Sequence, residues 1–336
     1  MPAPVAAATP SPPLVPLGHT GLLVSAIGLG LAGLGRPAYM TFDRDADLGG
    51  DRTVAAMRRR CHSMLDAAYA AGVRYVDAAR SYGLAEQFVR TWCDDRRLGE
   101  HALTIGSKWG YQYIGGWRLD ATVHEVKSLS AGALRAQLAQ TRAMLGSRLS
   151  LYQIHSATLE SGVLEDRAVI AELLRLRECG TCVGLTVTGP RQPEMIRAAL
   201  DVRGDGVPIF QTVQATWNLL EPSAGAALAE AHAAGCGVIV KEVLANGRLT
   251  TRRAAADRMR AVMDHAAHAG CTVETLAIAA ALQQPWADVV LSGALTPAQL
   301  HAALAALDVA GESAAAPIIA EPAESYWRRR AAVPWS

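Results

Sequence analysis

The chain of 336 residues lacks an uninterrupted apolar run of about 18 residues, the length an α-helix needs to cross a bilayer. It also lacks a strong net charge, since its formal charge is +1, which excludes the electrostatic signature of nucleic-acid or acidic-membrane binding. Residues 1–16 have neither the basic start nor the continuous apolar stretch of a signal peptide. We therefore expect a cytoplasmic protein with a small-molecule partner, no nucleic acid and no membrane.

The chain has few cysteines for its length, six in all and widely spread, which argues against a disulfide scaffold. Cys179 and Cys182 have the spacing of a thiol-redox pair, but they follow a helical pattern instead of preceding one, so we interpret them as structural. His265 and His268 form the only helical histidine pair, and a zinc site would need a second pair of ligands. No metal site is predicted.

Short β-branched runs alternate with longer segments of helical period from residue 22 onward, a pattern typical of βαβ units around a parallel sheet. Strands are predicted at 25–29, 73–77, 103–108, 150–155, 182–187, 209–214, 237–241 and 288–292. Helices are predicted at 53–71, 84–97, 126–145, 167–178, 192–201, 222–234, 252–268, 273–283 and 297–307. Eight strands predict a closed (β/α)8 TIM barrel of the α/β class, a single domain.

The domain is predicted to span residues 17–336 with a C-terminal extension, after a disordered Pro/Ala-rich tail at 1–16. No heptad pattern or large apolar surface stripe stands out, so a monomer is the default expectation. Long connections at 31–52, at 109–125 and after residue 308 predict the long βα loops that form the mouth of a barrel active site.

Four aromatic residues cluster in the second of these loops, in a chain that is only 5% aromatic. They are Trp109, Tyr111, Tyr113 and Trp117. Such a cluster predicts an apolar, stacking wall for a bound substrate. The alternative is that these aromatics clamp the loop onto the barrel rim.

Polar residues stand where predicted strands end. Asp77, Lys108 and His155 each follow such a run, and Tyr82 lies five positions after Asp77. Because the carboxyl ends of parallel strands share one face of a barrel, these four side chains are expected to converge. A tyrosine can donate its proton to a developing alkoxide, a neighbouring Lys⁺ lowers the tyrosine pKa, and a carboxylate keeps that lysine charged. A histidine can orient a substrate carbonyl.

These residues also occur in motifs that resemble the aldo-keto reductase family. The segment from Asp77 through Tyr82-Gly83 to Glu86 is similar to the family's Asp–Tyr–Glu signature, and Ser107-Lys108-Trp109 and Leu151 to His155 are similar to its Lys and His motifs. Residues 17–30 resemble its N-terminal hairpin and first strand, and 214–220 its segment after strand six. The resemblance covers roughly 17–307.

The resemblance implies a barrel that binds NADPH at its C-terminal face and transfers a hydride to or from a carbonyl or alcohol substrate. It implies Tyr82 as general acid/base, Lys108 and Asp77 as its tuning pair, and His155 as the residue that orients the carbonyl. Glu86 is expected to be structural. The cofactor-binding positions that it implies are Gly30, Asp77, Thr186, Gln214, Lys241, Leu244, Gly293, Thr296 and Gln299.

The chain departs from the family where the cofactor is expected. After strand five Thr186 keeps a hydroxyl, but Val187 stands where a second polar residue is usual. Lys241-Glu242 replaces an aromatic residue and a serine, and Glu242 would repel a diphosphate unless it pairs with Lys241 or Arg248. The turn at 292–296, which precedes the predicted helix 297–307, has no basic residue, and this predicts weak binding of a 2′-phosphate. NADPH is the expectation, with NADH or a lost cofactor as alternatives.

Two other functions stay open at this point. An intact acid/base set beside altered nicotinamide contacts also suits a redox-neutral enzyme on the same barrel, such as an isomerase, dehydratase or cyclase. A cofactor-sensing regulatory subunit is the third hypothesis, although such a module has no need of a proton relay.

Overall fold

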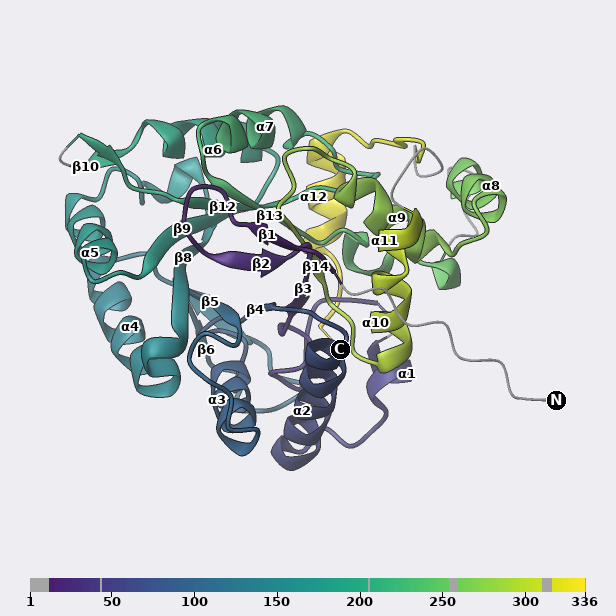
Figure 1. Ribbon diagram of the computed structural model, residues 1–336, viewed down its shortest axis with the longest axis horizontal. Helices are drawn as coiled ribbons and strands as arrows, with labels where there is room; N and C mark the ends of the chain where they lie inside the picture. Colours follow the sequence, from purple (N-terminus) through teal and green to yellow (C-terminus); the bar gives the residue numbers. More distant parts are fainter. Residues whose placement is uncertain (1–11, 43, 205, 254–258, 310–315, 336) are drawn as a thin grey trace.

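The computed structural model describes residues 12–42, 44–204, 206–253, 259–309 and 316–335. Its centre is a closed barrel of parallel strands in the order β12-β13-β14-β3-β4-β5-β8-β9, with helices around the outside (Figure 1). This confirms the predicted (β/α)8 TIM barrel. The barrel strands are β3 (Ile27–Gly30), β4 (Tyr75–Asp77), β5 (Thr104–Trp109), β8 (Leu149–Ala157), β9 (Cys182–Val187), β12 (Thr212–Thr216), β13 (Gly237–Lys241) and β14 (Val289–Ser292).

Helices follow most barrel strands, and several bury a single apolar face, whereas α9 is buried nearly all round. In α2 the buried positions Met57, Cys61, Met64, Leu65 and Ala68 recur at helical spacing, so the helix packs one apolar face on the barrel. The helices are α1 (Arg44–Leu48), α2 (Val54–Ala70), α3 (Ala85–Asp95), α4 (Ala131–Leu145), α5 (Arg167–Glu178), α6 (Gln192–Asp201), α7 (Gly225–Ala233), α8 (Arg260–His268), α9 (Val273–Leu282), α10 (Pro297–Leu304), α11 (Ala306–Val309) and α12 (Ala323–Ala331).

An N-terminal hairpin closes one end of the barrel. Strands β1 (Leu14–Pro16) and β2 (Leu23–Ser25) pair antiparallel, and Leu17 between them is fully buried in a cluster with Tyr75 and Leu151. The predicted tail boundary at residue 16 is therefore too late, because Leu14–Pro16 finds a strand partner. Residues 1–11 of that tail lie outside the described residues.

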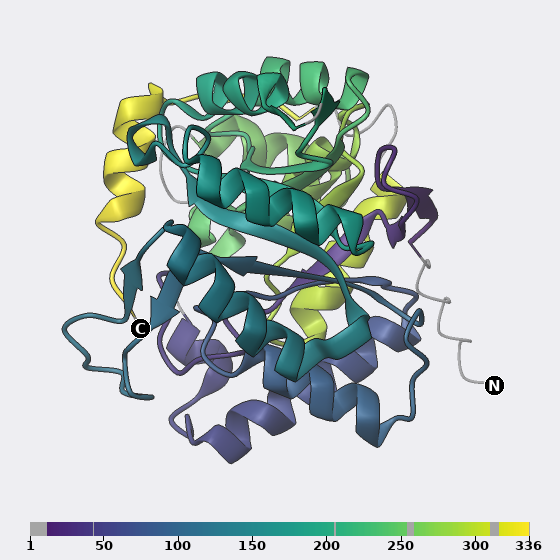
Figure 2. The ribbon, with the colours of Figure 1, turned by 90° about the vertical axis from the view of Figure 1, so that its left-hand side faces the viewer.

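The active-site end carries elements that were not predicted. The expected helix 126–145 begins only at Ala131, because β7 (Glu125–Lys127) pairs with β6 (Tyr111–Tyr113) in a hairpin. A second short pair, β10 (Arg203–Gly204) and β11 (Val207–Pro208), lies at the opposite end of the barrel, in the connection from α6 to β12. Figure 2 shows α12 and the C-terminus on the side of the molecule opposite the N-terminal hairpin.

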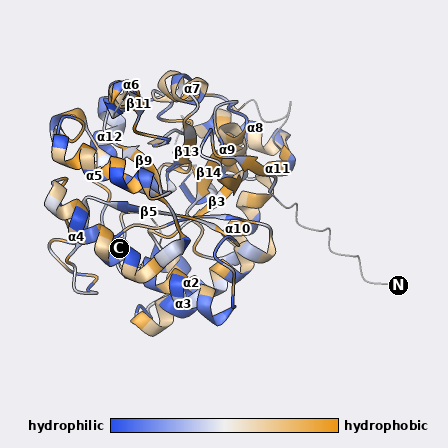
Figure 3. Ribbon diagram, turned by 60° about the vertical axis from the view of Figure 1, so that its left-hand side comes forward, coloured by the Kyte–Doolittle hydropathy of each residue, from blue (hydrophilic) through white to orange (hydrophobic). Residues whose placement is uncertain are grey.

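Apolar residues dominate the barrel wall, where β13 and β14 appear strongly hydrophobic in Figure 3, while α2 and α3 show mixed faces. The predicted helix 252–268 starts later than expected, since α8 begins at Arg260 and residues 254–258 lie outside the described residues.

None of the helices in the described ranges is both long enough and apolar enough to span a membrane.

Candidate active site

The structure brings the four strand-end residues together. Lys108 Nζ donates to Asp77 Oδ2, and it lies 3.2 Å from Tyr82 Oη and 3.0 Å from the carbonyl oxygen of Ala78. Gln214 Nε2 donates to the other carboxylate oxygen of Asp77 at 2.9 Å. Strands β4, β5 and β12 thus fix a hydrogen-bonded chain that runs from Gln214 through Asp77 and Lys108 to the phenol of Tyr82.

Two glycines hold Tyr82 in place. A Cβ at Gly35 would lie 2.2 Å from the carbonyl oxygen of Tyr82, and a Cβ at Gly83 would lie 2.5 Å from the carbonyl oxygen of Gly35. Gly83 also has a φ of +60°, a backbone conformation that residues other than glycine rarely adopt. The amide N–H of Leu84 donates to the Gly35 carbonyl at 2.8 Å. The loop after β3 therefore packs backbone against backbone on the tyrosine turn.

The site keeps its phenol and its imidazole uncharged. Burial, and then the charge of Asp77, raise the pKa of Tyr82 well above its ordinary value, so the phenol holds its proton. Any lowering of this pKa by the neighbouring Lys108 is outweighed, because burial and the charge of Asp77 raise the pKa of Tyr82 overall. Burial and four cations lower the pKa of His155 well below 6.5, so its imidazole is neutral. Burial also lowers the pKa of Lys108, against the opposing effect of Asp77.

Only part of the predicted aromatic wall lies at this site. The Tyr111 ring meets the His155 ring edge-on at 5.0 Å between centroids, and Tyr82 meets it at 5.5 Å. Trp109 is fully buried in the main hydrophobic core, because side chains alternate along β5 and Lys108 takes the inward position. Trp109 as a substrate contact is therefore wrong.

Tyr113 and Trp117 fasten the loop to the barrel instead. The Tyr113 hydroxyl accepts from the backbone N–H of Trp117 at 3.1 Å, and the Trp117 ring packs edge-on against Phe88 of α3. The Trp117 indole N–H donates to the carbonyl oxygen of Arg52 at 2.7 Å. For Tyr113 and Trp117 the structure therefore supports the alternative interpretation, in which the aromatic residues hold the loop on the barrel rim.

Glu86 serves as a buried anchor beside the site. Its carboxylate pairs with Arg80 and accepts from Ser107 Oγ at 2.6 Å and Thr141 Oγ1 at 2.8 Å. These contacts join α3, α4 and β5 behind Lys108. They agree with the structural role expected for Glu86, and they place Arg80 in an ion pair with a carboxylate.

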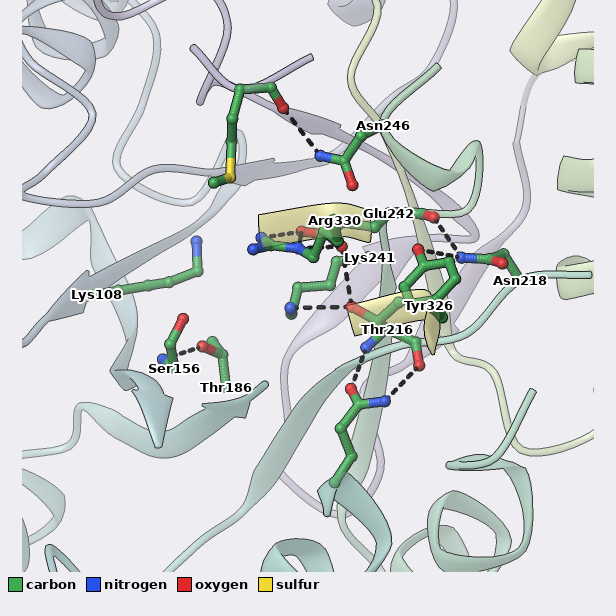
Figure 4. Close-up of polar contacts among 12 residues, drawn as sticks. Lys108, Ser156, Thr186, Thr216, Asn218, Lys241, Glu242, Asn246, Tyr326 and Arg330 are labelled. Atoms are coloured by element: carbon green, nitrogen blue, oxygen red, sulfur yellow. Dashed lines mark hydrogen bonds and ion pairs between the residues drawn. The ribbon is translucent and has the colours of Figure 1, made fainter. Parts of the chain in front are cut away.

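Figure 4 shows the polar residues of β9, β12 and β13 near the site, among them Thr186, Thr216 and Lys241, with Lys108 of β5 beside them. The Thr186 hydroxyl accepts from the backbone N–H of Ser156 at 2.7 Å. Lys241 Nζ donates to Thr216 Oγ1 at 3.1 Å. Glu242, with a φ of +55°, is gripped by Arg330 of α12 through contacts of 2.5 to 3.0 Å.

Arg330 is the functional residue that the sequence reasoning missed. Burial raises the pKa of Glu242, but Arg330 and Lys241 outweigh it and bring the pKa to about 2. Arg248, one of the two partners considered for Glu242, pairs with Glu321 instead, at 2.5 Å. The run of arginines at 328–330 gave no specific signal, because cations at a helix C-terminus are favoured by the helix dipole without any carboxylate partner.

The C-terminal segment reaches over the mouth. The Tyr326 hydroxyl accepts from Asn218 Nδ2 at 3.0 Å, which docks α12 on the loop after β12. Trp335 stacks on His124 of the β6–β7 loop at 4.4 Å between centroids, and the Arg36 guanidinium lies 4.8 Å from the Trp335 ring. The C-terminal extension therefore contacts both long loops next to the tetrad.

The remaining predicted cofactor positions gather around β3, β14 and α10. Thr296 caps α10, accepting from the N–H of Gln299 at 3.3 Å. Gln299 Nε2 donates to Asp47 at 2.7 Å, and Asp47 pairs with Arg252 at 3.0 Å. The other members of this group are Gly30 at the end of β3, Leu244 packed against the core, and the exposed Gly293.

Comparisons of the sequence and of the structure with known proteins point to the same protein family. A sequence model described as the aldo/keto reductase family matches residues 27–319. A putative aldo-keto reductase from Pseudomonas aeruginosa is similar in structure, with a TM-score of 0.62, 22% identity and coverage of 88% of this chain and 96% of the other. The holo form of an aldo-keto reductase from Bacillus halodurans has a TM-score of 0.65, 18% identity and coverage of 95% and 96%. No curated protein matches.

Proposed function

Because the chain belongs to the aldo/keto reductase family, we propose that it is an NAD(P)H-dependent oxidoreductase that interconverts a carbonyl and an alcohol. Tyr82 is its general acid/base. The observation that carries the proposal is the placement of Lys108, which donates to Asp77 and lies 3.2 Å from Tyr82 Oη.

Proton transfer follows from the charge states of the site. Tyr82 keeps its proton at neutral pH, so it donates to the alkoxide that forms as the carbonyl is reduced. Lys108 then faces the phenolate at hydrogen-bond distance and stabilises it, although burial and Asp77 disfavour that phenolate in the free protein. In the oxidative direction the same pair accepts the proton.

His155 supplies orientation in this proposal. Its Nδ1 lies 3.5 Å from Ser81 Oγ. If the serine donates to Nδ1, the neutral imidazole carries its proton on Nε2 and offers it to the substrate carbonyl oxygen. Tyr82 and His155 would then bind the same oxygen, with Tyr111 packed against the far edge of the imidazole.

The residues present fit a nicotinamide cofactor, which supplies the hydride when bound. The Thr186 hydroxyl accepts from Ser156 and keeps its own proton for a carboxamide oxygen, while Gln214 brings a side-chain amide to the same face. Arg330 neutralises Glu242, which removes the repulsion expected for a diphosphate. The N-terminus of α10 favours an anion.

We propose NADPH as the preferred form, with NADH as the alternative. The turn at Thr296 has no basic residue of its own, but Arg252 is held beside α10 through Asp47 and Gln299. A guanidinium there suits a 2′-phosphate. Dissociation constants for the two reduced cofactors, measured by protein fluorescence, test this preference.

The test of the function is a Tyr82→Phe variant with NADPH and a panel of aldehydes and ketones, followed at 340 nm. We expect kcat to fall by about 10²–10⁴-fold, the usual contribution of a positioned acid, with cofactor affinity little changed. Tyr113→Phe is the matched control, since its hydroxyl accepts a hydrogen bond from the loop backbone at Trp117. Equal activity in the wild type and Tyr82→Phe would contradict the proposal.

A redox-neutral enzyme is the second candidate, favoured by Lys241 at the end of β13 where relatives carry an aromatic residue. Its distinguishing result is conversion of a carbonyl substrate with no absorbance change at 340 nm, retained after removal of the cofactor. A strict requirement for reduced cofactor in stoichiometric amounts excludes it.

A further inference from the structure

Lysine is scarce in this chain, and every lysine lies at the active site. Of the 32 lysines and arginines, only Lys108, Lys127 and Lys241 are lysines. All three, together with Arg36, lower the pKa of His155. They come from three separate elements, namely β5, β7 and β13. The lysines of this protein therefore converge on the residue that orients the carbonyl.

The charges around the mouth do not balance. Lys108 pairs with Asp77, Arg36 pairs with Glu125 at 2.7 Å, and Arg330 takes both oxygens of Glu242. These three pairs engage Asp77, Glu125 and Glu242, and Glu160, whose charge also acts on Lys127, pairs with Arg191. Two cations, Lys241 and Lys127, are left over.

Among the residues that the structure describes, the two surplus lysines donate hydrogen bonds only to neutral groups, although the charges of Glu242 and Glu160 act on them from further away. Lys241 Nζ donates to the hydroxyl of Thr216, and Lys127 Nζ donates to the carbonyl oxygen of Ser156 at 2.7 Å. An ammonium group has three protons to donate. Lys241 is partly buried, and the adjacent carboxylate of Glu242 is already paired with Arg330. A partly desolvated cation without a hydrogen-bonded carboxylate is costly unless an anion completes it.

We propose that the substrate carries an anionic oxygen group, a carboxylate, beside its reactive carbonyl, and that Lys241 binds that carboxylate while Lys127 attracts it from the rim. This inference rests on the proposed function and names its substrate class. A carboxylate near the carbonyl would lie between Lys108 and Lys241, whose side chains extend toward one another in Figure 4. It would supply the negative charge that the mouth lacks.

The diphosphate of the cofactor is the other source of the same chemistry. The position of the surplus charge favours the substrate, because Lys127 donates to the carbonyl oxygen of Ser156, next to His155, and the charge of Lys241 acts on His155. The phosphate-binding end proposed above lies at α10, beside Arg252. The dissociation constant of NADPH, measured for the wild type and the Lys241 variants alongside turnover, decides between the substrate carboxylate and the cofactor diphosphate.

The experiment compares phenylglyoxylate with its methyl ester, which has the same ketone and no charge. In Lys241→Met we expect kcat/KM for the acid to fall by about 10- to 100-fold, the range for a lost hydrogen bond to a charged group, and the value for the ester to change less than about threefold. Lys241→Arg restores most of the preference. Arg135→Met removes one exposed charge on α4 and serves as the matched control.

Equal losses for acid and ester in Lys241→Met overturn the inference, as does a wild type that prefers the ester. A weaker Kd for NADPH with an unchanged preference for the acid also overturns it and assigns Lys241 to the diphosphate.

A second measurement is independent of turnover. With ¹³Cε-labelled lysine the protein gives three side-chain signals, assigned with the Lys→Met variants. Oxalate, which cannot be reduced at a ketone, should shift the Lys241 signal and raise its pKa. If no carbonyl is reduced by either cofactor, the proposed function fails, and the oxalate titration still tests the anion site. No shift at Lys241 up to millimolar oxalate refutes that site.

Discussion

The charge of Lys241 should cost the fold stability, and the cost can be measured. Burial lowers the pKa of Lys241 from the ordinary 10.5 to about 8, with Arg330 and Lys108 adding to the effect and Glu242 opposing it. Each pH unit of difference corresponds to about 1.4 kcal/mol, which gives about 3 kcal/mol. Loss of the hydrogen bond to Thr216 offsets about 1 kcal/mol. Lys241→Met should therefore be more stable than the wild type by about 2 kcal/mol near pH 7.

The sign of the pH dependence follows from the direction of the shift. The folded pKa lies below the unfolded pKa, so the unfolded chain binds more protons between pH 8 and 10.5. The penalty is full below pH 8 and disappears as the pH rises to 10.5. The gain from Lys241→Met should shrink over this window, which urea unfolding of both proteins at several pH values measures directly. A variant that is less stable near pH 7, or a gain that is independent of pH, refutes the reasoning.

Three further predictions concern other buried charges. Arg330→Met should destabilise the fold by about 2–3 kcal/mol in urea unfolding, because it leaves the Glu242 carboxylate unpaired, and adding Glu242→Gln should recover much of that loss. The ring signals of His155 should not titrate in NMR spectra between about pH 5.5 and 7.5, since its pKa lies well below 6.5; a midpoint near 6.5 would contradict this. Glu86→Gln should cost about 1–3 kcal/mol by weakening the buried pair with Arg80, and an unchanged urea midpoint would exclude the anchoring role.

The acid half of the site could be predicted from the sequence because its residues sit at fixed positions relative to strands. Asp77 and Lys108 lie on neighbouring barrel strands. Tyr82 lies in the turn that follows Asp77, and Gly83, with its positive φ, is a recognisable turn residue in the sequence. Period-two and helical patterns locate those strands within a few residues. Such local signals predict both which residue lies at the site and that its side chain points toward it.

The opposite half depends on tertiary contacts that have no local signal. Arg330 meets Glu242 across 88 positions of sequence, and only the docking of α12 decides which carboxylate it reaches. Trp109 shows the same limit on a smaller scale. The composition of its loop suggested an aromatic wall, but one residue of alternation along β5 turns its ring into the core.

The choice between lysine and arginine is itself informative in this chain. Within the described ranges, every ion pair of a lysine or arginine with a carboxylate uses arginine, apart from Lys108–Asp77. A guanidinium suits fixed, bidentate pairs and keeps its charge, whereas an ammonium is compact and changes its pKa readily. Lys241 therefore stands out as a cation whose pKa the protein lowers and that forms no ion pair within the described ranges. If binding an anion is its role, Lys241→Arg should keep the preference for an acid substrate and lose the pH dependence of stability between pH 8 and 10.5.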